Sequence, residues 1–193
     1  EVLVVDEEKS VVTYRISESN PTGVLRPPDF NEFQRISNLK SVDLGEDGVF
    51  IIDGDDWEYE AIGLPLHGGR QLENIEYMVV QSVTNDATEN MPVSSSIILD
   101  LWKRGLNTRS GFKYGTKWRC YPADVGEGHA PWLVVDPSSD NPKNWAEACL
   151  SSRLASGVNK DWLYPIKEGE NDWRYLQISR PPSDSRWSNP IRH

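Results

Sequence analysis

The 193-residue sequence is poor in cysteine and in long apolar runs. Its two cysteines, Cys120 and Cys149, are too few for a disulfide scaffold and form no CxxC metal motif. They are compatible with two buried thiols or with one stabilising disulfide. No window approaches the roughly 18 apolar residues of a membrane span, and the acidic start is unlike a signal peptide. We therefore expect no membrane association and no secretion. The first residue, Glu1, leaves open whether the chain is processed, trimmed or part of a longer polypeptide.

Several catalytic motifs are also missing. The sequence contains no HExxH, no P-loop GxxxxGK[ST], no GxGxxG and no GxSxG, so zincin, nucleotide-hydrolase, Rossmann and α/β-hydrolase chemistry lack their usual residues. Histidine is scarce, with only His67, His129 and His193. His129 follows the glycine-containing turn 126–128, and an imidazole there is the best candidate for proton transfer near neutral pH.

Charge is distributed unevenly between the two halves. The net charge of −10 combines a first half, residues 1–94, at −13 with a second half, residues 95–193, at +3. Within the second half, residues 97–121 carry six Lys or Arg against the single acid Asp100. Such a cluster binds a phosphate backbone by releasing its counterions, or it is simply a solvated face.

Residue patterns predict an α+β protein with mixed sheets. In residues 1–93, we expect an acidic, β-rich N-terminal domain with strands at 2–5, 10–16, 48–52 and 77–83, and a short helix after Pro28. Residues 84–96 are typical of a linker. Residues 94–180 then form a second domain, followed by a tail at 181–193.

The second domain has a clearer pattern. A helix capped by Ser94 or Ser95 and ending before Gly105 is expected first. Strands at 112–122 and 130–136, a helix at 144–158, and strands at 163–166 and 173–178 follow. This order predicts a mixed sheet with helices packed on it.

Three motifs in this domain resemble the tRNA-splicing endonuclease family of archaeal type. The first motif is an L-x-x-R-G pattern at 101–105, and the second is G-F-K-Y-G-x-x-W-x-x-Y at 111–121, followed by His129-Ala130. The third is R-L-A-x-x-V-x-K at 153–160. They occur in the family's order, whereas the first half resembles the family's N-terminal domain only in size and position. The resemblance implies a C-terminal nuclease domain similar to the restriction-endonuclease-like tRNA endonuclease fold.

The resemblance also implies a mechanism that needs no cofactor or metal. RNA carries its own nucleophile, the 2′-hydroxyl, so cleavage requires a base, an acid and a cation that stabilises the charged phosphorane. By resemblance, Tyr121 is the base, His129 the acid and Lys160 the stabilising cation. The products would be a 2′,3′-cyclic phosphate and a 5′-hydroxyl. Tyr121 would need nearby cations, because tyrosine normally ionises near pH 10.

The resemblance implies contacts with the RNA substrate, a precursor tRNA with a bulge-helix-bulge. Arg153, two helical turns before Lys160, would clamp a bulge base together with Arg174 or, as a substitute, Trp173. A structural ion pair is the alternative for Arg153. Lys113 lies in the basic segment and is a further candidate for RNA binding.

Assembly is implied as well. The acidic turn with Glu168, Glu170 and Asp172 would dock into a basic groove on a neighbouring unit, or it is simply solvated. The last strand, 175–178, would pair C-terminal domains edge to edge. Two bulges require two active sites, so we expect at least a dimer of identical or related units, in the cytoplasm, or in the nucleus of a eukaryote.

Three other functions remain open at this point. The chain could be a non-catalytic subunit of the splicing endonuclease, although the presence of Tyr121, His129 and Lys160 argues against this. It could be a metal-dependent nuclease with Asp136 as a ligand, or an RNA-binding module without activity.

Overall fold

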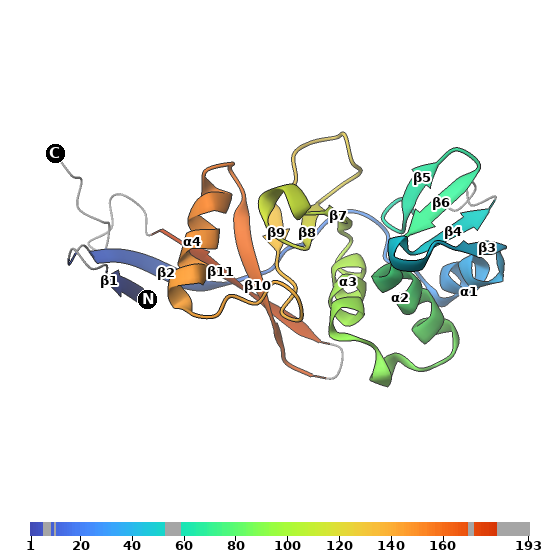
Figure 1. The fold of residues 1–193 in the computed structure, drawn as a ribbon, viewed down its shortest axis with the longest axis horizontal. Coiled ribbons are helices and arrows are strands. Elements are labelled where there is room, and N and C mark those ends of the chain that lie inside the picture. The colour runs from blue at the N-terminus through green and yellow to red at the C-terminus, as the bar shows by residue number, and fades with distance from the viewer. Residues whose placement is uncertain (6–8, 10, 53–58, 170–171, 181–193) are drawn as a thin grey trace.

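The computed structural model describes residues 1–5, 9, 11–52, 59–169 and 172–180. A four-stranded sheet and a seven-stranded sheet lie along the long axis of the molecule, with helices α1, α2 and α3 beside and between them (Figure 1). The predicted α+β class with a mixed sheet is confirmed. In the described part of the chain, no helix is long and apolar enough to cross a membrane.

The smaller sheet and two helices come from the first half of the chain. Its strands follow the order β3-β4-β6-β5, and their bounds are β3 Ser41–Asp43, β4 Val49–Ile52, β5 Leu64–Leu66 and β6 Gly69–Leu72. Helix α1, Phe30–Asn38, begins where predicted, because the Asp29 carboxylate accepts the N–H of Glu32 at 3.0 Å. Phe33 and Ile36 on its inner face are buried. The sequence pattern had revealed β4 but not β3, β5 or β6.

Residues 77–83 are helical, so the predicted strand there is wrong. They belong to helix α2, Asn74–Thr84, which begins with a capping box between Glu73 and Glu76. The run of β-branched residues suggested a strand, yet the adjacent Val79 and Val80 are both buried. Residues next to each other in a strand point to opposite faces, whereas a helix packed between α1 and α3 can bury both. Tertiary packing has overridden the local β propensity.

Helix α3, Val93–Lys103, connects the two sheets. Its start is not capped by a serine as predicted, because Pro92 holds the cap position and the Ser94 hydroxyl instead donates to Asp136 at 2.6 Å. Most of the predicted linker 84–96 lies in helices, because α2 ends at Thr84, a short 3-10 helix spans Thr88–Asn90, and α3 begins at Val93. Gly105 ends α3 with a φ of 76°, as the sequence indicated. A side chain there would meet backbone atoms of Gly23 and Leu25, so glycine also permits this close crossing.

The larger sheet has the strand order β1-β2-β11-β10-β9-β8-β7. In the second half, β9 and β10 are parallel, whereas the other neighbours are antiparallel. The predicted strand 112–122 forms only partly, because residues 112–114 are a 3-10 helix, η4. The sequence analysis also missed the preceding strand, β7. The elements of this half are β7 Asn107–Ser110, β8 Trp118–Tyr121, β9 Trp132–Val134, α4 Trp145–Ser156, β10 Asp161–Lys167 and β11 Trp173–Ser179.

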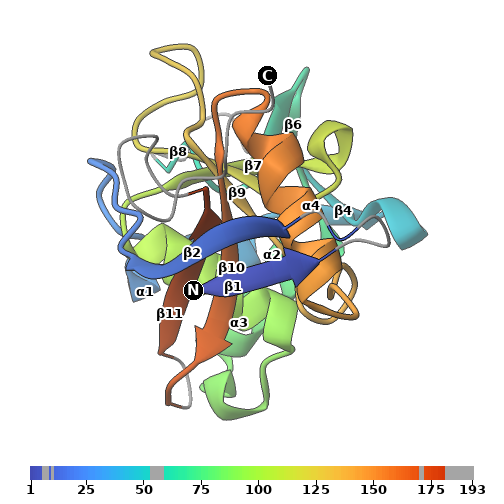
Figure 2. The same cartoon turned by 90° about the vertical axis from the view of Figure 1, so that its left-hand side faces the viewer.

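The first residues of the chain extend this second sheet. Strand β2, Val11–Ser19, pairs with β11, and β1, Val2–Val5, pairs with β2, as the blue and red strands in Figure 2 show. β11 is therefore not an edge strand, and its outer edge is closed to the edge-to-edge pairing that we expected. The division into domains at residue 93 remains a prediction, but β1 and β2 lie on the sheet of the second half.

Both faces of the large sheet are covered by apolar packing. One face joins α3 and the N-terminal helices in a core that includes Trp102, Cys120, Leu163 and Trp173. The other face packs against α4 and includes Leu133, Cys149 and Trp162. Cys120 and Cys149 belong to different clusters and are free thiols, so the disulfide alternative is excluded. Burial raises the pKa of both thiols.

Candidate active site

Three strand ends meet at one end of the large sheet. β8 ends at Tyr121, β9 begins at Trp132, and β10 begins at Asp161. Trp132 pairs with Cys120 on one side and with Asp161 on the other. Tyr121, the loop 122–131 with His129, and Lys160 are therefore placed at the same end of the sheet, which we call the loop end.

Lys160 reaches this end from the turn that follows α4. The turn folds back through a hydrogen bond from the Lys160 N–H to the Ala155 carbonyl at 3.0 Å, with Asn159 at a φ of 56°. Lys160 is only 9% exposed, and its ammonium donates a hydrogen bond to the carbonyl of Ala130. Because Ala130 directly follows His129, this bond places the Lys160 ammonium beside the backbone of the segment that carries the candidate acid.

Tyr121 and His129 differ in their exposure. Tyr121 is 8% exposed, and the Arg119 guanidinium carbon lies 5.7 Å from the centre of its ring. His129 is exposed on the loop, where it can meet a ligand from solvent. The loop itself turns through a hydrogen bond from the Glu127 N–H to the Asp124 carbonyl at 3.2 Å. The arrangement provides a phenol, an imidazole and an ammonium, which together can remove a proton, donate a proton and stabilise an anion.

Two of the four predicted RNA-binding residues lie toward the loop end. Lys113 is exposed, and its ammonium is 5.4 Å from the ring centre of Tyr114, which also faces Lys160. Arg153 is exposed on the last turn of α4, the helix that leads to Lys160. Both side chains are accessible to a bound polyanion.

The other two predicted RNA-binding residues lie at the opposite end of the sheet. Arg174 pairs in the sheet with Ile166, and its guanidinium binds Glu168 at 2.6 Å and approaches Glu18 at 3.8 Å. Trp173 is buried, and its indole N–H donates to the Ser96 hydroxyl at 3.0 Å. A ring in the core is not free to stack on a base. The structure does not bring this pair together with Arg153.

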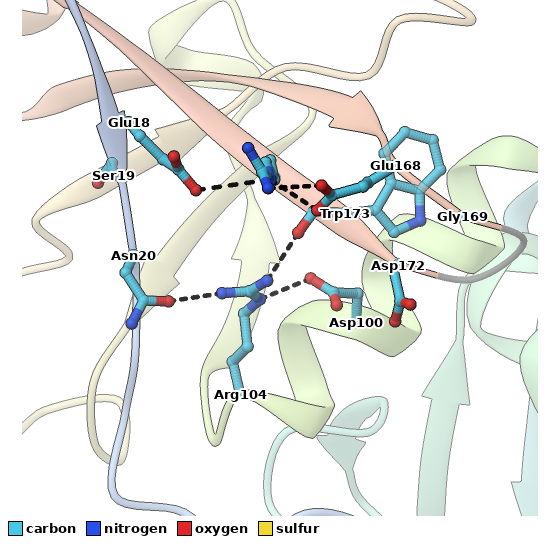
Figure 3. A pocket seen from close by; sticks show the side chains of 10 residues that line it. Glu18, Ser19, Asn20, Asp100, Arg104, Glu168, Gly169, Asp172 and Trp173 are labelled. Carbon is cyan, nitrogen blue, oxygen red and sulfur yellow. Dashed lines mark hydrogen bonds and ion pairs between the residues drawn. The ribbon is translucent and has the colours of Figure 1, made fainter.

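This opposite end, the hairpin end, also contains the predicted docking loop (Figure 3). Glu168 is tied to Arg174, and its backbone N–H donates to the Asp172 carbonyl at 2.9 Å. Both acids line a hollow of about 380 Å³ together with Arg104 and Asp100. Glu170 lies outside the described residues. The part of the loop that the structure describes is thus held by contacts within the chain.

Asp136, the metal ligand of the alternative hypothesis, has a structural role. One carboxylate oxygen accepts the Ser94 hydroxyl at 2.6 Å, and the other accepts the Ser138 N–H at 3.0 Å. The side chain is buried between the start of α3 and the turn after β9. Within the described ranges, no three His, Cys, Asp or Glu side chains are grouped to hold a metal ion.

Sequence reasoning missed three residues near the loop end. Tyr114 and Arg119 lie inside the 111–121 motif, but a one-dimensional pattern does not tell which ring a cation faces. Arg180 directly follows β11, and the Trp162–Ile178 pair places that end of β11 beside the start of β10. The pairing register of β10 and β11 places Arg180 toward the loop end and Arg174 at the opposite end. The sequence alone does not give this register.

Comparison with known proteins concerns the domain that contains these residues. Residues 93–175 match the tRNA intron endonuclease, catalytic C-terminal domain. The chain is 31% identical to a tRNA-splicing endonuclease of Picrophilus torridus over 180 residues, which cover 92% of this chain and 55% of that protein. It is 29% identical to a tRNA-splicing endonuclease of Thermoplasma volcanium over 177 residues, which cover 91% and 53%. For one of Methanopyrus kandleri, the identity is 33% over 86 residues, which cover 41% and 48%.

The two long matches extend the resemblance beyond the second half, where the sequence motifs had placed it. They include most of the acidic first half, and the chain spans about half the length of these two relatives. The match to the catalytic domain begins at the first residue of α3 and ends in β11, so it contains Tyr121, His129 and Lys160. Residues 93–175 therefore belong to the tRNA intron endonuclease catalytic-domain family, and most of the chain is similar to tRNA-splicing endonucleases.

Proposed function

We propose that this chain is an RNA endonuclease that removes introns from precursor tRNA at bulge-helix-bulge sites without a metal ion. The observation that carries the proposal is the meeting of Tyr121, His129 and Lys160 at the loop end of a tRNA intron endonuclease catalytic domain. Relatives over most of the chain are named tRNA-splicing endonucleases, which supports the same activity.

Each of the three residues has a role in the proposed reaction. Tyr121 removes the proton of the 2′-hydroxyl, whose oxygen attacks the adjacent phosphorus. His129 donates a proton to the departing 5′-oxygen, so the strand ends are a 2′,3′-cyclic phosphate and a 5′-hydroxyl. Lys160 stabilises the negative charge that accumulates on the phosphorane. The exposure of His129 on its loop supports this role, because the leaving oxygen must reach it.

The same end of the sheet is proposed to bind the RNA. Lys113 and Arg153 are exposed there, and cationic side chains are attracted to a phosphate backbone. For the partner of Arg153 across a splayed base, the geometry favours Arg180 over Arg174, because Arg180 follows β11 on the side of Lys160. Trp173, buried in the core, is not part of this proposal.

The proposed enzyme works as an assembly of at least two catalytic units, because two bulges need two active sites. The loop with Glu168 and Asp172 remains the proposed contact to a basic groove on the neighbouring unit. Since β2 covers the outer edge of β11, this assembly would have to use a different surface from that edge.

The test is cleavage of an end-labelled bulge-helix-bulge RNA in EDTA, with His129→Ala as the control and with both new ends identified. We expect the parent to make cyclic-phosphate and 5′-hydroxyl ends, and the variant to make almost none. Loss of the parent's activity in EDTA that added Mg²⁺ restores would overturn the metal-free mechanism. Binding without cleavage, also in the presence of Mg²⁺, would favour a structural subunit.

A further inference from the structure

Tyr114 lies against the ammonium group of Lys160. The Lys160 nitrogen is 5.2 Å from the centre of the Tyr114 ring, a distance at which a cation is attracted to an aromatic face. The ring is half-buried and packs on the apolar cluster beneath α4. Its backbone is fixed in η4, where the Tyr114 N–H donates to the Gly111 carbonyl at 2.7 Å. The aromatic face is therefore held in place before any substrate binds.

The way in which the charge of Lys160 is compensated is unusual for a buried lysine. Buried cations are normally paired with a carboxylate. Among the described residues, no carboxylate forms an ion pair with Lys160. Its ammonium instead donates to the Ala130 carbonyl and faces the Tyr114 ring. A carboxylate would cancel the positive charge, whereas a carbonyl dipole and an aromatic face stabilise the charge without neutralising it.

We infer that Tyr114 is a positioning residue, which holds the Lys160 ammonium in place and aimed at the scissile phosphate. The inference rests on the proposed function, in which Lys160 stabilises the phosphorane. Lys113 is the other cation near this ring, at 5.4 Å, so the ring supports two positive charges on the side where the polyanion binds.

Tyr114→Leu and Tyr114→Phe form the matched pair of variants. Leucine removes the aromatic face, and because such a contact contributes roughly 0.5–2 kcal/mol, we expect the single-turnover cleavage rate to fall about 2- to 30-fold. Phenylalanine keeps the face and should retain the rate. In a Lys160→Ala background, Tyr114→Leu should add almost no further loss, because two residues that act through one contact are not additive. An equal loss in both backgrounds would overturn the inference.

A second readout needs no RNA. The side-chain resonances of isotope-labelled lysine are recorded by NMR at one pH in the parent, in both Tyr114 variants and in Phe112→Leu, which changes the 88% exposed aromatic residue of the same turn. We expect the Lys160 side-chain resonances to shift in Tyr114→Leu alone, because the ammonium then loses the aromatic ring that it faces. Unchanged Lys160 resonances would overturn the inference. If the parent does not cleave RNA, the proposed function fails, and these spectra still decide whether Tyr114 lies against the ammonium.

Discussion

The two ends of the large sheet both hold cations, but they hold them differently. At the hairpin end, the Arg104 guanidinium binds the Asp100 carboxylate at 2.7 Å (Figure 3). Arg174 binds Glu168 at the same end. At the loop end, Lys160 faces a carbonyl and an aromatic ring. The charges of the first group are cancelled by neighbouring acids, and the charge of Lys160 is not.

The contacts at the hairpin end stabilise the fold, whereas those at the loop end leave a charge for a substrate. Arg104 also donates to the Asn20 side chain and to the Trp173 carbonyl, both at 2.7 Å, so one guanidinium joins α3, the segment after β2, and β11. Tyr175 donates to the same Asp100 carboxylate, and burial together with that carboxylate raises the pKa of Tyr175 well above its usual value. A network that satisfies itself stabilises the fold but leaves no free charge for a substrate. The loop end leaves such a charge.

Removing the uncancelled charge should have the largest effect on activity. On the proposed function, Lys160→Ala lowers the single-turnover cleavage rate by about 100- to 1,000-fold, as expected when one group that stabilises a transition-state charge is lost. RNA affinity, measured separately by filter binding, should change far less. A rate within about threefold of the parent would remove Lys160 from the mechanism.

Removing a cancelled charge should affect stability instead. Arg104→Ala leaves the Asp100 carboxylate, whose side chain is 11% exposed, without its cation, and breaking a buried pair on one side costs about 4 kcal/mol. We expect this loss in urea unfolding, with the cleavage rate of the remaining folded protein nearly unchanged. If the variant is as stable as the parent, the hairpin end does not have the structural role assigned to it.

Glu76 extends the comparison to a buried charge of the opposite sign. Its carboxylate accepts the N–H groups of Gly63 at 3.2 Å and Glu73 at 2.9 Å, and burial raises its pKa to about 7. A raised carboxylate pKa stabilises the fold at low pH, and this contribution is lost as the pH rises from about 4.5 through about 7. At about 1.4 kcal/mol per pKa unit, we expect a loss of roughly 3 kcal/mol in the free energy of unfolding. Glu76→Gln should remove most of this pH dependence in urea titrations at pH 5 and pH 8.

The smallest effect is expected from the exposed pair at the hairpin end. Arg174 and Glu168 are both more than half exposed, so Arg174→Ala should leave the free energy of unfolding almost unchanged. It should also leave RNA affinity almost unchanged, whereas Arg153→Ala at the loop end should weaken binding and reduce its salt dependence. Salt titrations of both variants measure this contrast, and equal losses would contradict the assignment of RNA to the loop end.

Local sequence was sufficient where local physics decides the structure. The starts of helices α1 and α4, the glycine that ends α3, and the apolar strands β4, β10 and β11 could be predicted from short stretches of sequence. Prediction from local sequence failed where burial against two neighbouring elements determines the structure, as in α2, whose β-branched residues pack between helices. The short polar strand β7 was missed for a similar reason, because pairing with β8 makes it a strand.

In the candidate site too, some features could be predicted from the sequence and others depend on the tertiary structure. The motif residues Tyr121, His129 and Lys160 could be selected from the sequence, because the family's pattern marks them by type and order. Spacing along the chain does not tell which end of a sheet a residue occupies. The pairing of β10 with β11 places Arg174 and Trp173 at the hairpin end, and β2 pairs with the outer edge of β11. Tertiary packing brings Tyr114 against Lys160. Residue types therefore establish which chemistry is available, whereas long-range pairing and packing determine which charges meet and which are cancelled.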